Sequence, residues 1–144
     1  MRHNPHGVAC MDVIRSHKDL IVWQKSIALA SAVYAATRML PSEERFGLTQ
    51  QLRRASVSIA SNIAEGSARR SRAEFRQFLH IARGSLSELE TQMMIAIDQG
   101  FISSGKSPVA GITEVGRLLN GLIRSLASSS TAAHAKACSP IANR

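Results

Sequence analysis

The segment between Ser71 and Gly100 places the tightest limit on how this chain can fold. Its apolar residues recur at strictly alternating steps of four and three, a spacing that lines one face of a helix. They are Phe75, Leu79, Ala82, Leu86, Leu89, Met93 and Ala96. In front of them, Ser71 and Glu74 have the spacing of a capping box, which predicts that the helix starts here. Nearly three heptads of such a seam are typical of a helix in a bundle.

Two glycines in this segment predict how the helix packs and where it ends. Gly84 lies inside the helical pattern, where glycine costs roughly 1 kcal/mol against alanine. We therefore expect a close contact with a neighbouring helix at Gly84. Gly100 follows the last apolar position and is expected to close the helix.

Two segments before this one also have helical spacing. Residues 19–39 have Asp19 as the predicted N-cap and end before Pro41. Their expected buried face is Leu20, Trp23, Ile27, Ala30 and Tyr34. Residues 48–65 form the second segment, with Gly66 predicted as the left-handed residue that ends it. The apolar face of this second segment is Leu48, Leu52, Ala55, Ile59 and Ile63, and small residues follow at Ser56, Ala60 and Ala64.

A fourth helix is predicted from Ser107 as N-cap and Pro108 as its first residue. Its apolar positions are Ile112, Val115, Leu119, Leu122 and Leu126. Beyond residue 127 the chain becomes rich in serine and alanine and loses its period, which predicts a disordered tail over residues 128–144. Residues 1–17 show no sustained period either and are expected to be a flexible extension.

Four amphipathic helices with short connections and no strand pattern predict an all-α fold. The 144 residues suffice for one core. Only 4% of them are aromatic, so leucine, isoleucine, valine, alanine and methionine must fill that core. We expect a single domain over residues 18–127, folded as an up-down-up-down antiparallel four-helix bundle.

The charge of the chain favours anionic partners. The net charge is +8, and the stretch from Arg45 to Arg83 holds eight arginines against two glutamates, which is +6 of that total. Arginine also suits bidentate phosphate contacts better than lysine does. The residues predicted to bind the backbone of RNA or DNA are Arg53, Arg54, Arg69, Arg70, Arg72, Arg76 and Arg83.

Four of these arginines crowd the loop and first turn before the third helix, where a positive charge is unfavourable. They are Arg69, Arg70, Arg72 and Arg76. The arrangement predicts that an anion such as phosphate lies nearby. The alternative is a solvated basic loop that contributes only solubility. No alternation of aromatic and basic residues of the kind found in single-strand binders is evident, and sequence-specific readout is not expected.

Polar residues also interrupt the small-residue faces of the second and third helices. We predict that Ser58, Asn62, Glu65, Ser87 and Glu90 build a partly buried polar network or a subunit interface. The simpler alternative is a set of surface ion pairs, each worth less than about 1 kcal/mol.

No enzyme template fits the sequence. There is no Glu-x-x-His pair of a di-metal bundle, no HExxH, no CxxC, no Walker-type loop and no GxGxxG. We therefore predict no catalytic residue, no metal and no cofactor. Cys10 and Cys138 lie near opposite ends and do not resemble a disulfide scaffold. No apolar run is long enough to span a membrane, and we expect a cytoplasmic protein without membrane contact.

Four runs of residues resemble a bacterial family. They are DLIVWQK from Asp19, LTQQLRRA from Leu48, SIASNIAEG from Ser58 and ARGSLSELE from Ala82. The sequence resembles the four-helix-bundle proteins named after the 23S rRNA intervening-sequence protein, which include the accessory variability determinants of diversity-generating retroelements. The resemblance covers residues 19–102. It implies an up-down bundle that assembles as a ring-shaped homopentamer with a basic surface, and in the retroelement branch a ring that binds nucleic acid and a reverse transcriptase.

Two functional hypotheses follow from the residues and the resemblance. The first is a non-enzymatic, homo-oligomeric scaffold that binds RNA or DNA, with a reverse transcriptase as a further partner. The second is a protein-interaction module without a nucleic-acid role, in which the polar residues form a subunit interface and the positive charge recruits an acidic protein.

Overall fold

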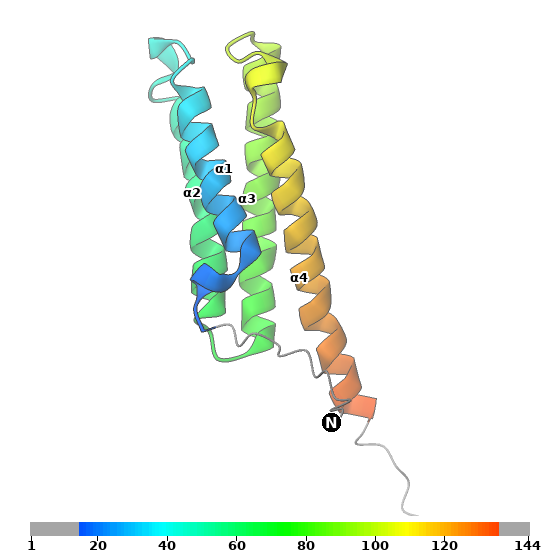
Figure 1. Ribbon diagram of the computed structural model, residues 1–144. Coiled ribbons are helices and arrows are strands. Elements are labelled where there is room, and N and C mark those ends of the chain that lie inside the picture. Colours follow the sequence, from blue (N-terminus) through cyan, green and yellow to red (C-terminus); the bar gives the residue numbers. More distant parts are fainter. Residues whose placement is uncertain (1–14, 136–144) are drawn as a thin grey trace, which may run out of the picture.

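The computed structural model describes residues 15–135, with side chains through residue 128, and these residues form four helices with no strand. The helices are α1 (Ile21–Thr37), α2 (Leu48–Ser67), α3 (Arg72–Asp98) and α4 (Val109–Ala135). Three single 3₁₀ turns accompany them: η1 (His17–Asp19), η2 (Ser42–Glu44) and η3 (Ser104–Lys106). Consecutive helices run in opposite directions and α4 returns beside α1 (Figure 1). The predicted all-α, up-down-up-down four-helix bundle is confirmed.

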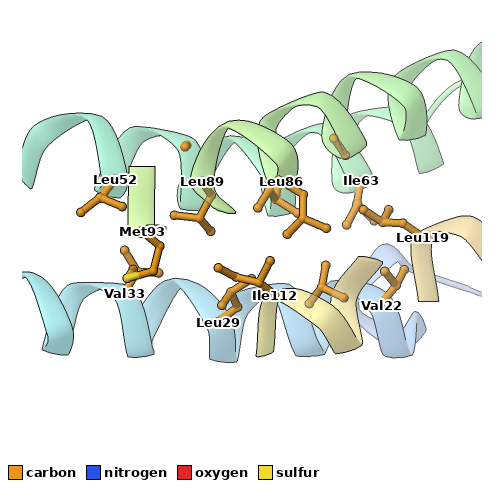
Figure 2. Packing of buried hydrophobic residues seen from close by; sticks show 14 of the residues in the cluster. Val22, Leu29, Val33, Leu52, Ile63, Leu86, Leu89, Met93, Ile112 and Leu119 are labelled. Carbon is orange, nitrogen blue, oxygen red and sulfur yellow. The ribbon is translucent and has the colours of Figure 1, made fainter. Parts of the chain in front are cut away.

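The core is an aliphatic column that all four helices line. Leu29 and Val33 of α1 point toward Leu89 and Met93 of α3, and Ile112 of α4 enters from the side (Figure 2). Leu52, Ile59, Ile63, Leu79, Leu119 and Val115 are also almost completely buried. The most extensive contact between two helices joins α2 and α3. The α2–α3 pair therefore forms the rigid frame on which most of the predicted binding residues lie.

The predicted faces of α2 and α3 are confirmed, but the predicted face of the first helix is right only at its start, where Leu20 is buried and Trp23 packs against the core. The residues of α1 that are buried are Val22, Ser26, Leu29, Val33 and Ala36, with Thr37 in its last turn. Ile27 and Tyr34, expected inside, are 42% and 41% exposed. This helix is apolar on most sides, so its period allowed two registers. The structure buries the register that contains Val22, Leu29 and Val33 and leaves Ile27 and Tyr34 outside.

Helix ends differ from the sequence expectations at three points. Ser16, not Asp19, caps the first turn: its hydroxyl accepts from the Lys18 amide, and the Asp19 carboxylate accepts from the Ser16 amide. Helix α4 begins at Val109, directly after Pro108, and continues to Ala135, beyond the predicted end of the bundle at residue 127. The predicted tails over residues 1–17 and 128–144 are described in part: residues 15–17 lead into and begin η1, and residues 128–135 belong to α4. The rest of both tails, with Cys10 and Cys138, lies outside the described residues.

The start and the end of α3 follow the prediction closely. The Ser71 hydroxyl accepts a hydrogen bond from the Glu74 amide at 3.2 Å, while the Glu74 carboxylate bonds the serine hydroxyl rather than its amide. Gly100 has a φ of +72°, and its amide donates to the carbonyl of Ile97. The Phe101 amide donates to the carbonyl of Ala96, which completes a Schellman motif.

Neither Gly84 nor Gly66 has the role that the sequence predicted for it. A Cβ atom at Gly84 would meet nothing within 4 Å, so the predicted close contact there is wrong. Gly66 is not the residue after α2 but lies inside the helix, which ends at Ser67. Phe75 and Phe78 of α3 press against Gly66. The close approach of α2 and α3 is therefore at their shared turn.

No helix within the described part of the chain is both long enough and apolar enough to cross a membrane.

Candidate nucleic-acid interface

The α2–α3 hairpin carries all seven arginines predicted to bind nucleic acid, but it separates them into two groups. Arg69 and Arg70 lie in the turn, followed by Arg72 and Arg76 in the first two turns of α3. Arg53 and Arg54 lie near the opposite end of the hairpin, about 22 Å along α2 from the turn at 1.5 Å per residue. Arg83 lies between the two groups, in the middle of α3.

The group at the turn is largely unpaired. Arg69 forms an ion pair with Glu65, and its guanidinium lies 4.8 Å from the centroid of the Phe78 ring. Arg70 and Arg72 are exposed and Arg76 is half-buried. None of these three lies within ion-pair distance of a carboxylate among the residues whose side chains are described. At this turn, Arg70, Arg72 and Arg76 therefore present guanidinium groups that no carboxylate within the described side chains neutralises.

Three of the arginines share one stripe of α3. Arg72 and Arg76 are one turn apart, and Arg83 follows seven residues later, which returns to the same face of a helix. Ser87 and Glu90 continue this stripe. The stripe is thus basic toward the turn and acidic toward the other end of α3.

Only two of the five residues predicted to form a polar network, Ser58 and Asn62, are hydrogen-bonded to one another. The hydroxyl groups of Ser58 in α2 and Ser85 in α3 share a hydrogen bond of 2.9 Å, and the Asn62 amide donates to the Ser58 hydroxyl at 3.1 Å and to its carbonyl at 2.8 Å. Glu65 contacts Arg69 instead of Asn62. Ser87 bonds only the carbonyl of Arg83 in its own helix, at 3.3 Å, and Glu90 is exposed.

A second polar contact between α2 and α3 was not predicted. Gln92 is buried, and its amide nitrogen donates to Glu88 at 2.9 Å and to Gln51 at 3.4 Å. The Gln92 carbonyl oxygen is buried without a hydrogen-bond partner among the described residues. The contact therefore joins the two helices but leaves one acceptor unsatisfied, which costs free energy.

An aromatic groove at the start of α2 was also missed by sequence reasoning. Tyr34 of α1 and Phe46 of the connection line it together with Arg45, Arg53 and Arg54, and its volume is about 600 Å³. The spacing of Tyr34 fits a helical face and predicts a core position, but the side chain is 41% exposed. The one signal in the sequence is Phe46, a large aromatic residue within a charged turn.

No group of three or more histidine, cysteine, aspartate or glutamate side chains is placed to hold a metal ion among the described residues.

Comparison with known proteins identifies the relatives of this bundle. Residues 18–121 match the 23S rRNA-intervening sequence protein family. A crystal structure of a protein with unknown function from the S23 ribosomal protein family of Bacteroides thetaiotaomicron is similar to the chain, with 29% sequence identity and a TM-score of 0.66. The match covers 72% of this chain and 98% of that one. No curated protein matches.

Proposed function

Because the chain belongs to the 23S rRNA-intervening sequence protein family, we propose that it is a non-enzymatic, homo-oligomeric four-helix-bundle protein that binds the backbone of RNA or DNA. The observation that carries this proposal is the unpaired positive charge of the α2–α3 hairpin. Of its seven arginines, only Arg69 forms an ion pair with a described carboxylate. Guanidinium groups bind phosphate through two parallel, charge-assisted hydrogen bonds, as they bind carboxylate.

The spacing of the basic stripe on α3 suits an extended polyanion. Arg72 and Arg83 are about 16 Å apart along the helix axis at 1.5 Å per residue. One strand of duplex DNA rises about 3.4 Å per phosphate, so the stripe spans roughly five nucleotides. Arg69 and Arg70 extend this surface around the turn. The contacts are to the backbone, which gives affinity without reading the sequence.

Two surfaces of opposite charge support self-association. On α3, Met94 and Ile95 are 59% and 47% exposed and share a shallow pocket with Glu90 and Asp98. A second groove, between α1 and α4, is lined by Ile21, Leu118 and Leu122 with Arg117 and Arg124 beside them. Asp19 also lines this groove, so its rim carries two arginines against one aspartate, whereas the charged residues of the α3 pocket are both acidic. Two different surfaces that fit one another form a heterologous contact, which can close into a ring.

The binding proposal is tested by the salt dependence of affinity in matched variants. Fluorescence anisotropy of a labelled RNA would be recorded over a series of salt concentrations. Each phosphate contact with a single strand contributes about −0.7 to the slope of log affinity against log salt, so Arg69→Ala/Arg70→Ala/Arg72→Ala should flatten the slope by up to about 2.1. The control Lys25→Ala/Arg38→Ala/Lys106→Ala removes the same charge from exposed positions outside the hairpin and outside the proposed contact between copies. Equal flattening in both variants would contradict a binding surface on the hairpin.

A second candidate function is a protein-interaction scaffold, which the exposed apolar pair Met94 and Ile95 favours. A reverse transcriptase is a candidate partner in either case, through the resemblance to retroelement accessory proteins. Co-purification of a partner after nuclease treatment, with no affinity of the pure protein for nucleic acid, would favour the scaffold over the nucleic-acid binder.

A further inference from the structure

The groove between α1 and the start of α2 combines an exposed aromatic ring with several guanidinium groups. Phe46 is 82% exposed, the largest exposed fraction among the large apolar side chains that the structure describes. The Arg45 guanidinium lies 5.4 Å from the centroid of its ring. An aromatic ring in water with a cation beside it is the arrangement on which nucleobases stack.

The floor of the groove is preorganised by Arg53. Its guanidinium lies 4.7 Å from the centroid of the Tyr34 ring, and its Nε donates to the Thr37 hydroxyl at 2.9 Å. Thr37 is buried, and its own hydroxyl donates to the carbonyl of Tyr34 at 3.0 Å. These contacts leave both terminal nitrogens of Arg53 without a partner among the described residues. A side chain held in this way loses little entropy when it binds an anion.

The charge of the groove is uncompensated. Arg45, Arg53 and Arg54 line it, and none of its lining residues is acidic. Glu44, next to Arg45 in the sequence, is engaged at the helix terminus, where its carboxylate accepts from the Leu48 amide at 3.0 Å. Glu88 lines the adjoining pocket with Arg54 and does not line this groove. The groove thus offers an aromatic platform and an anion-binding rim in one volume of about 600 Å³, within the range of sites for small organic ligands.

We propose that this groove binds an unpaired nucleobase of a single-stranded RNA or DNA, stacked on Phe46, with the flanking phosphates on Arg45, Arg53 and Arg54. This inference rests on the proposed function and adds to it a ligand class, single strand rather than duplex. A duplex hides the faces of its bases inside the stack, whereas an unpaired base can lie on an aromatic side chain. The α2–α3 turn binds backbone of either kind.

The experiment compares three ligands: a short single strand of uridines, a strand of equal length that lacks bases, and a duplex of equal length. Affinities would be measured by fluorescence anisotropy at one low salt concentration. The variant Phe46→Ala removes a side chain that is mostly in water, so the fold should be retained. Met39→Ala is the matched control, because Met39 is 53% exposed and does not line the groove.

The expected result is a loss of affinity for the uridine strand alone. Base stacking on one aromatic side chain corresponds to roughly 5- to 150-fold in affinity. Phe46→Ala should weaken binding of the uridine strand by a factor in this range and leave the base-free strand and the duplex unchanged. Phe46→Leu should also weaken binding of the uridine strand, by most of the same factor, because an aliphatic side chain cannot stack on a base. Phe46→Trp should bind the uridine strand at least as tightly as the unmodified protein. Met39→Ala should change nothing.

Three outcomes would overturn the inference, and they are distinguishable. If Phe46→Ala binds all three ligands as the unmodified protein does, the groove does not bind bases, although the proposed function stands. If the unmodified protein binds none of the ligands, the proposed function fails as well. If Phe46→Ala changes the mass measured by light scattering and weakens all ligands equally, a second copy of the chain covers the groove instead.

Discussion

A Cβ atom placed on Gly66 of α2 would lie 2.6 Å from the Cβ of Phe78 in α3. The same atom would lie 2.9 Å from the ring of Phe75 and 3.3 Å from its carbonyl oxygen. Real Cβ atoms do not approach one another this closely, so the turn between the two helices needs glycine at this position. Because Arg69 and Arg72 flank that turn, the same contact sets where the basic surface lies.

Two glycine substitutions should therefore change the free energy of unfolding in opposite directions. Gly66→Ala should lower the free energy of unfolding by about 1–3 kcal/mol, since α2 and α3 must separate to admit the methyl group. Gly84→Ala should raise it by up to about 1 kcal/mol, because Gly84 is a helical position with open space around it. Urea denaturation of both variants measures the difference. A destabilised Gly84→Ala protein would show that a neighbour contacts Gly84 after all.

The cap of α3 should contribute measurably to stability. Ser71→Ala removes the acceptor of the Glu74 amide and should cost about 1 kcal/mol. For a chain of this size that corresponds to roughly 3 °C in Tm. Ser87→Ala in the exposed middle of the same helix is the control. It should leave Tm unchanged or raise it slightly, because alanine is the better helix former.

Gln92 should be replaceable by an apolar residue of similar shape. Its carbonyl oxygen is buried without a partner, and Gln51 and Glu88, which its amide contacts, are both exposed. Gln92→Met removes the unsatisfied acceptor and leaves its former partners in water, so stability in urea should stay the same or increase by about 1 kcal/mol. A loss of more than about 2 kcal/mol would mean that the Gln51–Gln92–Glu88 contact is a net stabilising feature.

Reversing the charge of one proposed contact surface should weaken self-association, and reversing the charge of the other surface as well should restore it. Glu90→Arg/Asp98→Arg places positive charge opposite Arg117 and Arg124 in the proposed contact, and light scattering should then report a smaller assembly. Adding Arg117→Glu/Arg124→Glu in the same chain restores the opposite signs and should restore the mass. An unmodified protein that is a monomer at micromolar concentration would remove the contact altogether.

The sequence predicted the bundle well where a helix has one clear apolar face. In α3 the seam from Phe75 to Ala96, the cap at Ser71 and the left-handed Gly100 are all local signals, and all are present in the structure. In α1 the local signal is ambiguous, because both sets of positions are apolar. Only the packing against the other three helices selects the register with Leu29 and Val33 inside.

The candidate site was predicted less completely, for a related reason. The arginines could be found by composition, but their division between the α2–α3 turn and the start of α2 depends on the hairpin geometry. The aromatic groove requires Tyr34 to point outward and Phe46 to approach it across the connection. Neither fact is local to the sequence, so no pattern along the chain indicates that Tyr34, Phe46 and Arg53 meet.

The most direct test of the central claim is the affinity of the unmodified protein for RNA as a function of salt. If the arginines of the α2–α3 hairpin bind phosphates, log affinity should fall linearly with log salt concentration. At least four contacts with a single-stranded RNA, at about 0.7 each, predict a slope of roughly −3 or steeper. Binding that is undetectable at the lowest salt concentration, or that does not change with salt, would contradict the account.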